Sequence, residues 1–211
     1  MNHWLPAFLR IFFRLLYHQL AWTYDLVAWI VSLGRWKSWV YSSLPYLHGP
    51  RVLELGPGPG HLQIALAHKC IQVYGMDASS QMVHQAARRL GKVNFPNRLV
   101  VGKAPDLPFA SSSFDQVVAT FPTEYIFLQP TLREVQRLLV PGGSLVIIPL
   151  AWITGGGRLN RLAAGLFHLT GQAPAWDERI LEPFAQAGLD ATAHPTRLKD
   201  SEVMIILARK P

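Results

Sequence analysis

The sequence predicts an α/β fold with a largely parallel sheet and helices on both faces. Its 211 residues are a comfortable length for one such domain with a sizeable core. After Pro50, short β-branched runs alternate with amphipathic stretches, which is typical of repeated βα units. A glycine-rich turn joins the first of these strands to a helix, and such a turn lets a ligand approach the backbone.

The predicted elements follow one another from Arg51 onward. The first strand covers residues 51–55, the glycine turn 56–60 and the first helix 61–68. The next helix begins at Ser79 or Ser80, which would act as its N-cap. Further predicted segments are strands at 71–77, 99–101, 114–120 and 143–149, a helix at 132–139 and a turn at 141–143.

The first 48 residues differ in composition from the rest, so we expect an N-terminal helical cap at 1–48 and a ligand-binding domain at 49–211. Arg10, Arg14 and His18 recur every four residues along an otherwise apolar stretch, which predicts an amphipathic helix. The interrupting charges fit neither a signal peptide nor a membrane span. Two roles stay open for residues 1–20: packing on the core or a partner, and peripheral contact with a lipid surface.

Charge and cysteine content narrow the class of protein. The formal net charge is +7, but no run of five to eight Lys/Arg residues occurs, which argues against a nucleic-acid partner. The single Cys70 excludes an internal disulfide framework, and no Cys/His spacing of the zinc type is found. We therefore expect no metal and a reducing compartment, the cytoplasm. The sequence does not indicate an oligomeric state.

The glycine turn has the spacing G-x-G-x-G, at Gly56, Gly58 and Gly60. A dinucleotide-binding turn has the spacing G-x-G-x-x-G, so the third glycine comes one position too early here. Glu54 precedes the turn by two residues, and Asp77 ends the second predicted strand. Asp77 lies about twenty residues beyond the first glycine, at the usual distance for a carboxylate that binds ribose hydroxyls.

Four motifs in this order resemble the S-adenosylmethionine-binding core of class I methyltransferases. They are V-L-E-L-G-P-G-P-G, G-M-D-A-S-S-Q-M, L-P-F-A-S-S-S-F-D and R-L-L-V-P-G-G, within residues 51–148. The resemblance implies a Rossmann-like seven-stranded methyltransferase sheet whose last two strands are antiparallel. Residues 190–196 and 203–208 could supply those strands, after a helix at 181–188. It also implies S-adenosylmethionine as cofactor, with S-adenosylhomocysteine as product.

The resemblance assigns cofactor-binding residues one by one. Glu54, Gly56 and Gly58 would lie around the methionine part, and Asp77 would hold the ribose. Gly102-Lys103-Ala104 replaces the acidic residue that relatives place near adenine, so Ala104 or Asp106 would have to take its place. The remaining cofactor candidates are Tyr24, Gly60, Ala78, Met82 and Thr120.

The N-terminal segment is similar to ubiquinone/menaquinone-biosynthesis C-methyltransferases, within the methyltransferase type 11 group. The similarity lies in the segments at 24–28, 32–34 and 36–39, with Ala28 in place of an asparagine often found there. It implies methyl transfer to a small lipophilic acceptor that is quinone-like, phenolic or a lipid. Phospholipid N-methyltransferases share a similar Tyr-Asp helix, so a phospholipid or small-amine N-methyltransferase stays an alternative. A non-catalytic, cofactor-binding, membrane-peripheral protein is a third hypothesis.

A carbon or phenol acceptor needs a general base, whereas an amine needs only to arrive unprotonated. Tyr125, Glu124 and His61 are the candidate bases, and a structural role competes with catalysis for each of them. A predicted apolar helix containing Leu162 and Phe167, together with the N-terminal helix, would wall an apolar acceptor pocket.

Overall fold

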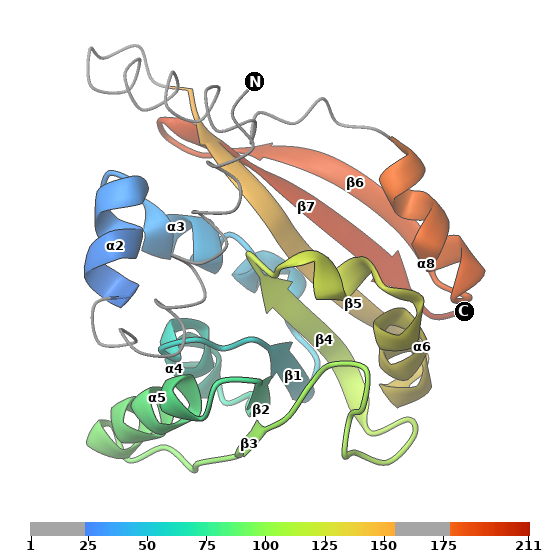
Figure 1. Ribbon diagram of the computed structural model, residues 1–211, viewed down its shortest axis with the longest axis horizontal. Coiled ribbons are helices and arrows are strands. Elements are labelled where there is room, and N and C mark those ends of the chain that lie inside the picture. Colours follow the sequence, from blue (N-terminus) through green and yellow to red (C-terminus); the bar gives the residue numbers. More distant parts are fainter. Residues whose placement is uncertain (1–23, 155–177) are drawn as a thin grey trace, which may run out of the picture.

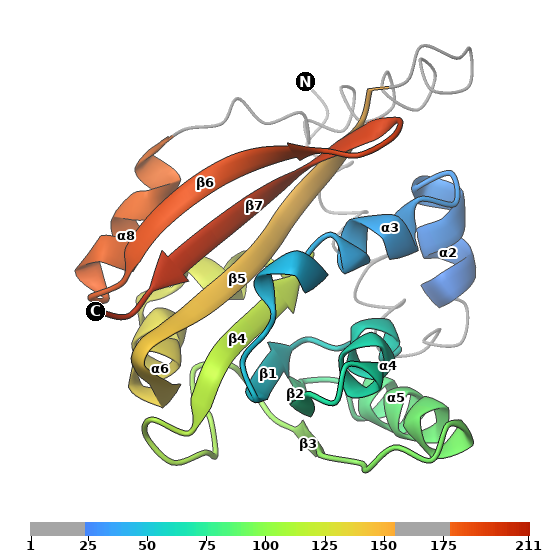
Figure 2. The same cartoon turned by 180° about the vertical axis from the view of Figure 1, so that it is seen from behind.

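A computed structural model describes residues 24–154 and 178–211, and it confirms the predicted fold. Its seven strands form one sheet in the order β3-β2-β1-β4-β5-β7-β6 (Figures 1 and 2). The first five strands are parallel, and β7 is antiparallel to both β5 and β6. The strands are β1 (Arg51–Leu55), β2 (Gln72–Asp77), β3 (Leu99–Val101), β4 (Phe114–Thr120), β5 (Leu139–Ile153), β6 (Asp190–Arg197) and β7 (Ser201–Arg209).

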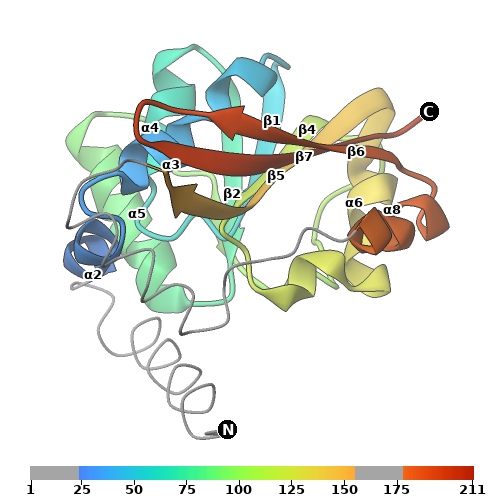
Figure 3. The same ribbon diagram turned by 90° about the horizontal axis from the view of Figure 1, so that it is seen from above.

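The helices of the described residues gather in two groups. In Figure 3, α4 and α5 lie beside the β1–β2 half of the sheet, and α6 and α8 lie together beside the other half. The α-helices are α2 (Tyr24–Val31), α3 (Trp36–Tyr41), α4 (His61–His68), α5 (Ser80–Lys92), α6 (Gln129–Leu138) and α8 (Glu182–Gln186). The shorter 3₁₀ helices are η2 (Leu44–Tyr46), η3 (Glu124–Phe127) and η4 (Glu178–Leu181).

Successive strand residues belong alternately to two buried clusters, as expected for a sheet covered on both faces. On β1, Val52 belongs to a cluster with α3 and α4, whereas the next residue, Leu53, belongs to a cluster with α6 and α8. Val117 and Val118 of β4 divide in the same way. The central strands are therefore buried on both sides, and their carboxyl ends form a fixed edge on which a site can be built.

Strand β5 is longer than the sequence predicts, and the predicted turn at 141–143 is wrong. The strand begins at Leu139, directly after α6, and its register against β4 shifts between Phe114↔Leu139 and Gln116↔Ser144. The residues in between form a bulge with Gly142 at φ +76°. Backbone hydrogen bonds to Lys210, beyond the end of β7, hold this bulge in the sheet. The antiparallel partner strand, which local turn residues cannot indicate, thus extends β5.

Several predictions concern residues outside those described. The predicted acceptor-pocket helix with Leu162 and Phe167 falls in residues 155–177, and the predicted N-terminal amphipathic helix falls in residues 1–23. The domain boundary at 48/49 stays a prediction, although α2 and α3 do form helices ahead of it. Within 24–154 and 178–211, no helix combines the length and the apolar character needed to cross a bilayer.

Candidate functional site

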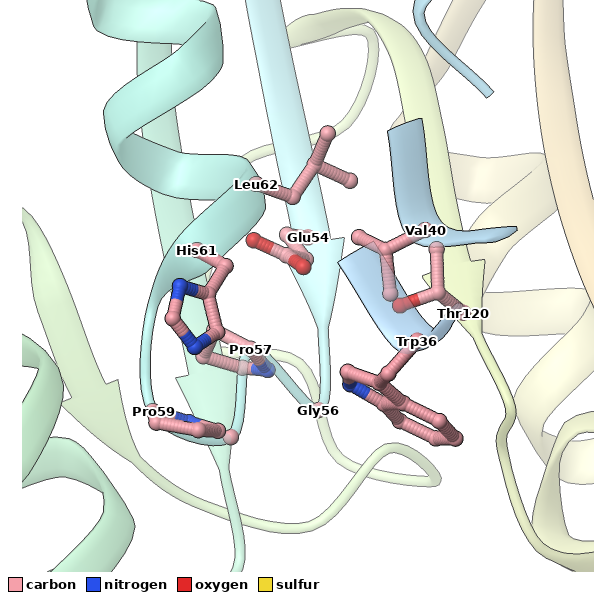
Figure 4. Close-up of a pocket in the computed structure, with 10 residues that line it drawn as sticks. Trp36, Val40, Glu54, Gly56, Pro57, Pro59, His61, Leu62 and Thr120 are labelled. Carbon is pink, nitrogen blue, oxygen red and sulfur yellow. The ribbon is translucent and has the colours of Figure 1, made fainter. Parts of the chain in front are cut away.

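A recess lies at the carboxyl ends of β1 and β4, where open α/β sheets bind ligands. In Figure 4, the Glu54 carboxylate points into it, with His61 and Leu62 on one side and Trp36, Val40 and Thr120 on the other. The sequence-predicted residues that the recess brings together are Glu54, Gly56, Gly58, His61 and Thr120. Its other lining residues are Trp36, Val40, Pro57, Pro59 and Leu62.

The glycines of the turn serve different purposes. Gly58 has φ +49°, and a Cβ built on it would meet nothing within 4 Å, so the backbone there is open to a ligand. Gly60 has φ +84°, but its added Cβ would lie 2.9 Å from the Cβ of Ala86 in α5. Gly60 therefore allows α4 and α5 to pack closely, and it is not among the lining residues.

Asp77, the predicted ribose-binding carboxylate, lies next to the turn. Its Oδ2 accepts a 3.2 Å hydrogen bond from the backbone N–H of Gly58, and its Oδ1 accepts one of 2.9 Å from that of Ser79. The Ser79 hydroxyl oxygen in turn accepts from the N–H of Met82 and caps α5. Asp77 thus joins the glycine turn to the start of the following helix.

Glu54 is a buried carboxylate at the floor of the recess, 1% exposed. Its Oε2 accepts a 2.8 Å hydrogen bond from Nε2 of Gln63. Burial raises the pKa of Glu54 to about 7, because the ionised form loses its hydration, and the charge of Asp77 raises it further against the opposing effect of Gln63. A carboxylate in such surroundings is stabilised by a cationic ligand group.

His61 is the first residue of α4 and lies between two charged residues that the sequence reading did not connect with it. Its Nε2 lies 2.9 Å from Oδ1 of Asp25 in α2, and Arg89 of α5 contacts both side chains. The hydrogen bond from His61, together with Arg89, lowers the pKa of Asp25 to about 2 in spite of partial burial. No local pattern could have revealed this contact, because the residues belong to three helices.

An aromatic wall stands across the recess from α4. The rings of Trp36 and Phe121 have centroids 4.5 Å apart at an interplanar angle of 32°, and Trp39 lies 6.1 Å from Phe121. Phe121 directly follows β4 and has φ +52°, an uncommon conformation for a bulky side chain. Sequence reasoning included Trp36 only within the segment at 36–39 and did not identify it as part of the site.

The other sequence-predicted residues have varied surroundings. The Tyr125 hydroxyl lies over the turn, 3.4 Å from the carbonyl oxygen of Leu55, to which it donates. Glu124 and Ala78 are exposed, whereas Met82 and Ala104 are buried. Tyr24 begins α2, and the predicted contact of its side chain lies outside what the structure describes. In the described ranges, no three His, Cys, Asp or Glu side chains are grouped so that they could hold a metal.

Comparisons with known proteins show what this chain is similar to. Residues 53–147 match the family model described as a methyltransferase domain. A demethylmenaquinone methyltransferase of Thermotoga maritima is 33% identical over 141 residues, which are 64% of this chain and 60% of that protein. An uncharacterized methyltransferase of Synechocystis is 33% identical over 147 residues, which are 65% of this chain and 67% of that protein.

Solved structures share the fold. The crystal structure of geranyl diphosphate C-methyltransferase from Streptomyces coelicolor has a TM-score of 0.63 at 17% identity, over 86% of this chain and 82% of that chain. The chain spans about 60% of the length of the first curated relatives that it matches. On the family match, the shared sheet and the relatives, the chain belongs to the class I S-adenosylmethionine-dependent methyltransferases.

Proposed function

We propose that this protein transfers a methyl group from S-adenosylmethionine to a small lipophilic acceptor of quinone-like, phenolic or lipid character. The observation that carries the proposal is the pairing, in one recess, of a buried carboxylate with an open glycine turn and an aromatic wall. The turn and the carboxylate suit the cofactor, and the wall suits a flat, apolar acceptor.

The residues present fit the proposed cofactor. The open backbone at Gly58 leaves room that a Cβ would fill, and Glu54 offers a buried negative charge to the cationic part of the ligand. Asp77 would hold the ribose, and its bond to the N–H of Gly58 would keep the turn in shape. Gly56, Ala78, Met82, Ala104 and Thr120 are proposed to complete the site, together with Tyr24.

Two observations support the proposed acceptor. Trp36 lines the recess, and its ring packs against that of Phe121. Relatives of which this chain covers 60% bear the names of demethylmenaquinone and ubiquinone/menaquinone C-methyltransferases. A nucleophilic carbon or oxygen of the acceptor would form the new bond to the methyl group as the sulfur–methyl bond breaks, and a base would take the acceptor's proton.

Among the three candidate bases, we favour Tyr125. Its hydroxyl lies beside the glycine turn, 3.3 Å from where a Cβ of Gly56 would stand. Both ring nitrogens of His61 lie within hydrogen-bonding distance of Asp25 or Arg89, so the imidazole is already engaged by these two side chains. Glu124 is exposed to solvent. A side chain in η3, which follows the carboxyl end of β4, is well placed to orient an acceptor, which is the main task of such an enzyme.

Isothermal titration with S-adenosylmethionine and S-adenosylhomocysteine tests the cofactor, with Asp77→Ala as the comparison. Micromolar binding by the wild type and its loss in Asp77→Ala is the expected result, and no binding by folded wild-type protein would overturn the proposal. Transfer of a labelled methyl group to quinols, phenols, phospholipids and small amines then identifies the acceptor. Exclusive use of amines would replace this proposal with an N-methyltransferase.

We also propose peripheral membrane contact through residues 1–20, since the adjoining helix α2 exposes Leu26, Trp29 and Ile30 by 54–61%. Such contact would give the enzyme access to an acceptor dissolved in lipid. Co-sedimentation with anionic liposomes, with and without residues 1–20, checks this. Equal pelleting of the two proteins would refute a role for the segment.

A further inference from the structure

Asp25, His61 and Arg89 form a cluster, here called the α2 anchor, that joins three helices beside the recess. Nε2 of His61 lies 2.9 Å from Oδ1 of Asp25, and an amino group of Arg89 lies 2.7 Å from the same Nε2. Arg89 also forms an ion pair with Oδ2 of Asp25. The anchor therefore connects α2 to α4, the helix that begins directly after the glycine turn.

Asp25 and Arg89 carry opposite charges, and both contact the ring of His61. Nδ1 of that ring lies 3.2 Å from a guanidinium nitrogen of Arg89. The pKa of Asp25 is lowered to about 2, first by the hydrogen bond from His61 and then by Arg89. Asp25 is therefore ionised at every pH at which the protein would work.

Apolar packing contributes little to holding α2 in place. Of the α2 side chains that the structure describes, only Ala28 is buried, whereas Leu26, Trp29, Ile30 and Val31 are 49–61% exposed. A helix of eight residues is not stable by itself in water. The polar anchor is thus a principal attachment of α2 to the part of the domain that forms the recess.

The position of α2 bears on the shape of the recess. A short turn joins α2 to α3, and α3 supplies Trp36 and Val40 to the wall opposite His61. His61 is at once a member of the anchor and a lining residue. The anchor consequently holds the segment that carries one wall to the helix that carries the other.

We infer that Asp25 is a positioning residue which, through His61 and Arg89, holds α2 beside the glycine turn and slows release of the cofactor. This inference rests on the proposed function. Asp25 need not touch the cofactor, so its loss should change how long the ligand stays bound more than how fast it arrives. Loss of the anchor would loosen α2 at the edge of the recess while leaving Glu54, Gly58 and Asp77 in place.

The test compares Asp25→Asn with wild type by stopped-flow association and release of S-adenosylhomocysteine. The amide keeps the shape of the side chain but removes the charge that pairs with Arg89. We expect release about tenfold faster and association within about twofold. Asp25→Glu, which keeps the charge, should restore part of the slow release. Hydrogen exchange should also show that the ligand protects the amides of α2 in wild type and not in Asp25→Asn.

Asp115→Asn is the matched control. Asp115 also pairs with an arginine, Arg51, at 3.1 Å, and its side chain is 23% exposed against 38% for Asp25, but the pair lies at the opposite ends of the strands. Its variant should release the ligand as wild type does. Unchanged release from Asp25→Asn, or a lower melting temperature with unchanged release, would overturn the inference alone. Absence of binding by wild type and by Asp115→Asn would overturn the proposed function and this inference with it.

Discussion

Gln63 donates hydrogen bonds from its single Nε2 atom to both Oε2 of Glu54, at 2.8 Å, and the carbonyl oxygen of Tyr74, at 3.1 Å. Gln63 and Glu54 are each 1% exposed. The amide is oriented by the β2 backbone, so it presents a donor to the carboxylate. Gln63 thus stabilises the ionised form of Glu54 while burial opposes it, and the pKa of about 7 reflects the greater effect of burial.

Stability should fall as the pH rises from about 4.5 to about 7, the ordinary and the native pKa values of Glu54. In this window the native protein holds a proton that the unfolded chain has lost, so ionisation disfavours the native state. The full effect is about 3 kcal/mol. Glu54→Gln should be more stable than wild type at pH 8 and nearly equal to it at pH 4.5. Urea unfolding at both values checks this, and exposed Glu124→Gln should reproduce the wild-type profile.

Cofactor affinity should rise as Glu54 ionises, whereas stability falls. A cationic ligand favours the ionised carboxylate, so binding should release a proton at pH 6 and tighten as the pH rises toward 8. Glu54→Gln should bind S-adenosylmethionine at least about tenfold more weakly, since one lost charge interaction of this kind is worth more than ~1.4 kcal/mol. Titration calorimetry in buffers of different ionisation enthalpy measures the proton. Equal affinity of Glu54→Gln and wild type would refute the assigned role.

Alanine substitutions of two turn glycines should differ in their effects on stability and on cofactor binding. Gly60→Ala places a Cβ 2.9 Å from that of Ala86 at φ +84°, so it should lower the free energy of unfolding by about 2 kcal/mol or more. Gly58→Ala meets no neighbour, so it should cost only about 1 kcal/mol while reducing cofactor affinity. Calorimetric melting and ligand titration of both variants check this.

Gly91→Ala is the control for both glycine variants. Gly91 lies within α5, and an added Cβ would meet nothing within 4 Å. The substitution should therefore stabilise the protein by up to about 1 kcal/mol. If Gly58→Ala and Gly60→Ala lost equal stability, the packing role of Gly60 would be wrong.

Much of the fold could be predicted because its signals are local. The strand at 51–55, the turn and the helix at 61–68 have the predicted bounds. These bounds follow from the change between β-branched and amphipathic stretches and from the glycines of the turn. Glu54 and Asp77 could be placed beside the turn for the same reason, since each stands at a fixed offset from it in the sequence. The prediction was wrong at 141–143, where hydrogen bonds to Lys210 draw a proline-glycine segment into β5.

The contacts between distant segments could not be predicted from one sequence. Asp25 and Arg89 are 64 residues apart, and the residues next to each of them in the sequence do not indicate that the two are in contact. The contact of Trp36 with Phe121 likewise depends on how α3 crosses the end of β4. Such pairs depend on tertiary packing, which helix and strand periodicity do not encode.

Phe121 offers a direct measurement of strain beside the site. Its φ of +52° costs an ordinary side chain about 1 kcal/mol or more, and backbone strain of this kind tends to occur at functional sites. Phe121→Ala and Phe121→Gly both lose the contact with Trp36, but only glycine adopts this conformation without penalty. The glycine variant should therefore be more stable than the alanine variant by about 1 kcal/mol, the reverse of the usual order. Denaturant unfolding of the two variants decides the matter: if alanine were the more stable, the aromatic wall would be held without strain.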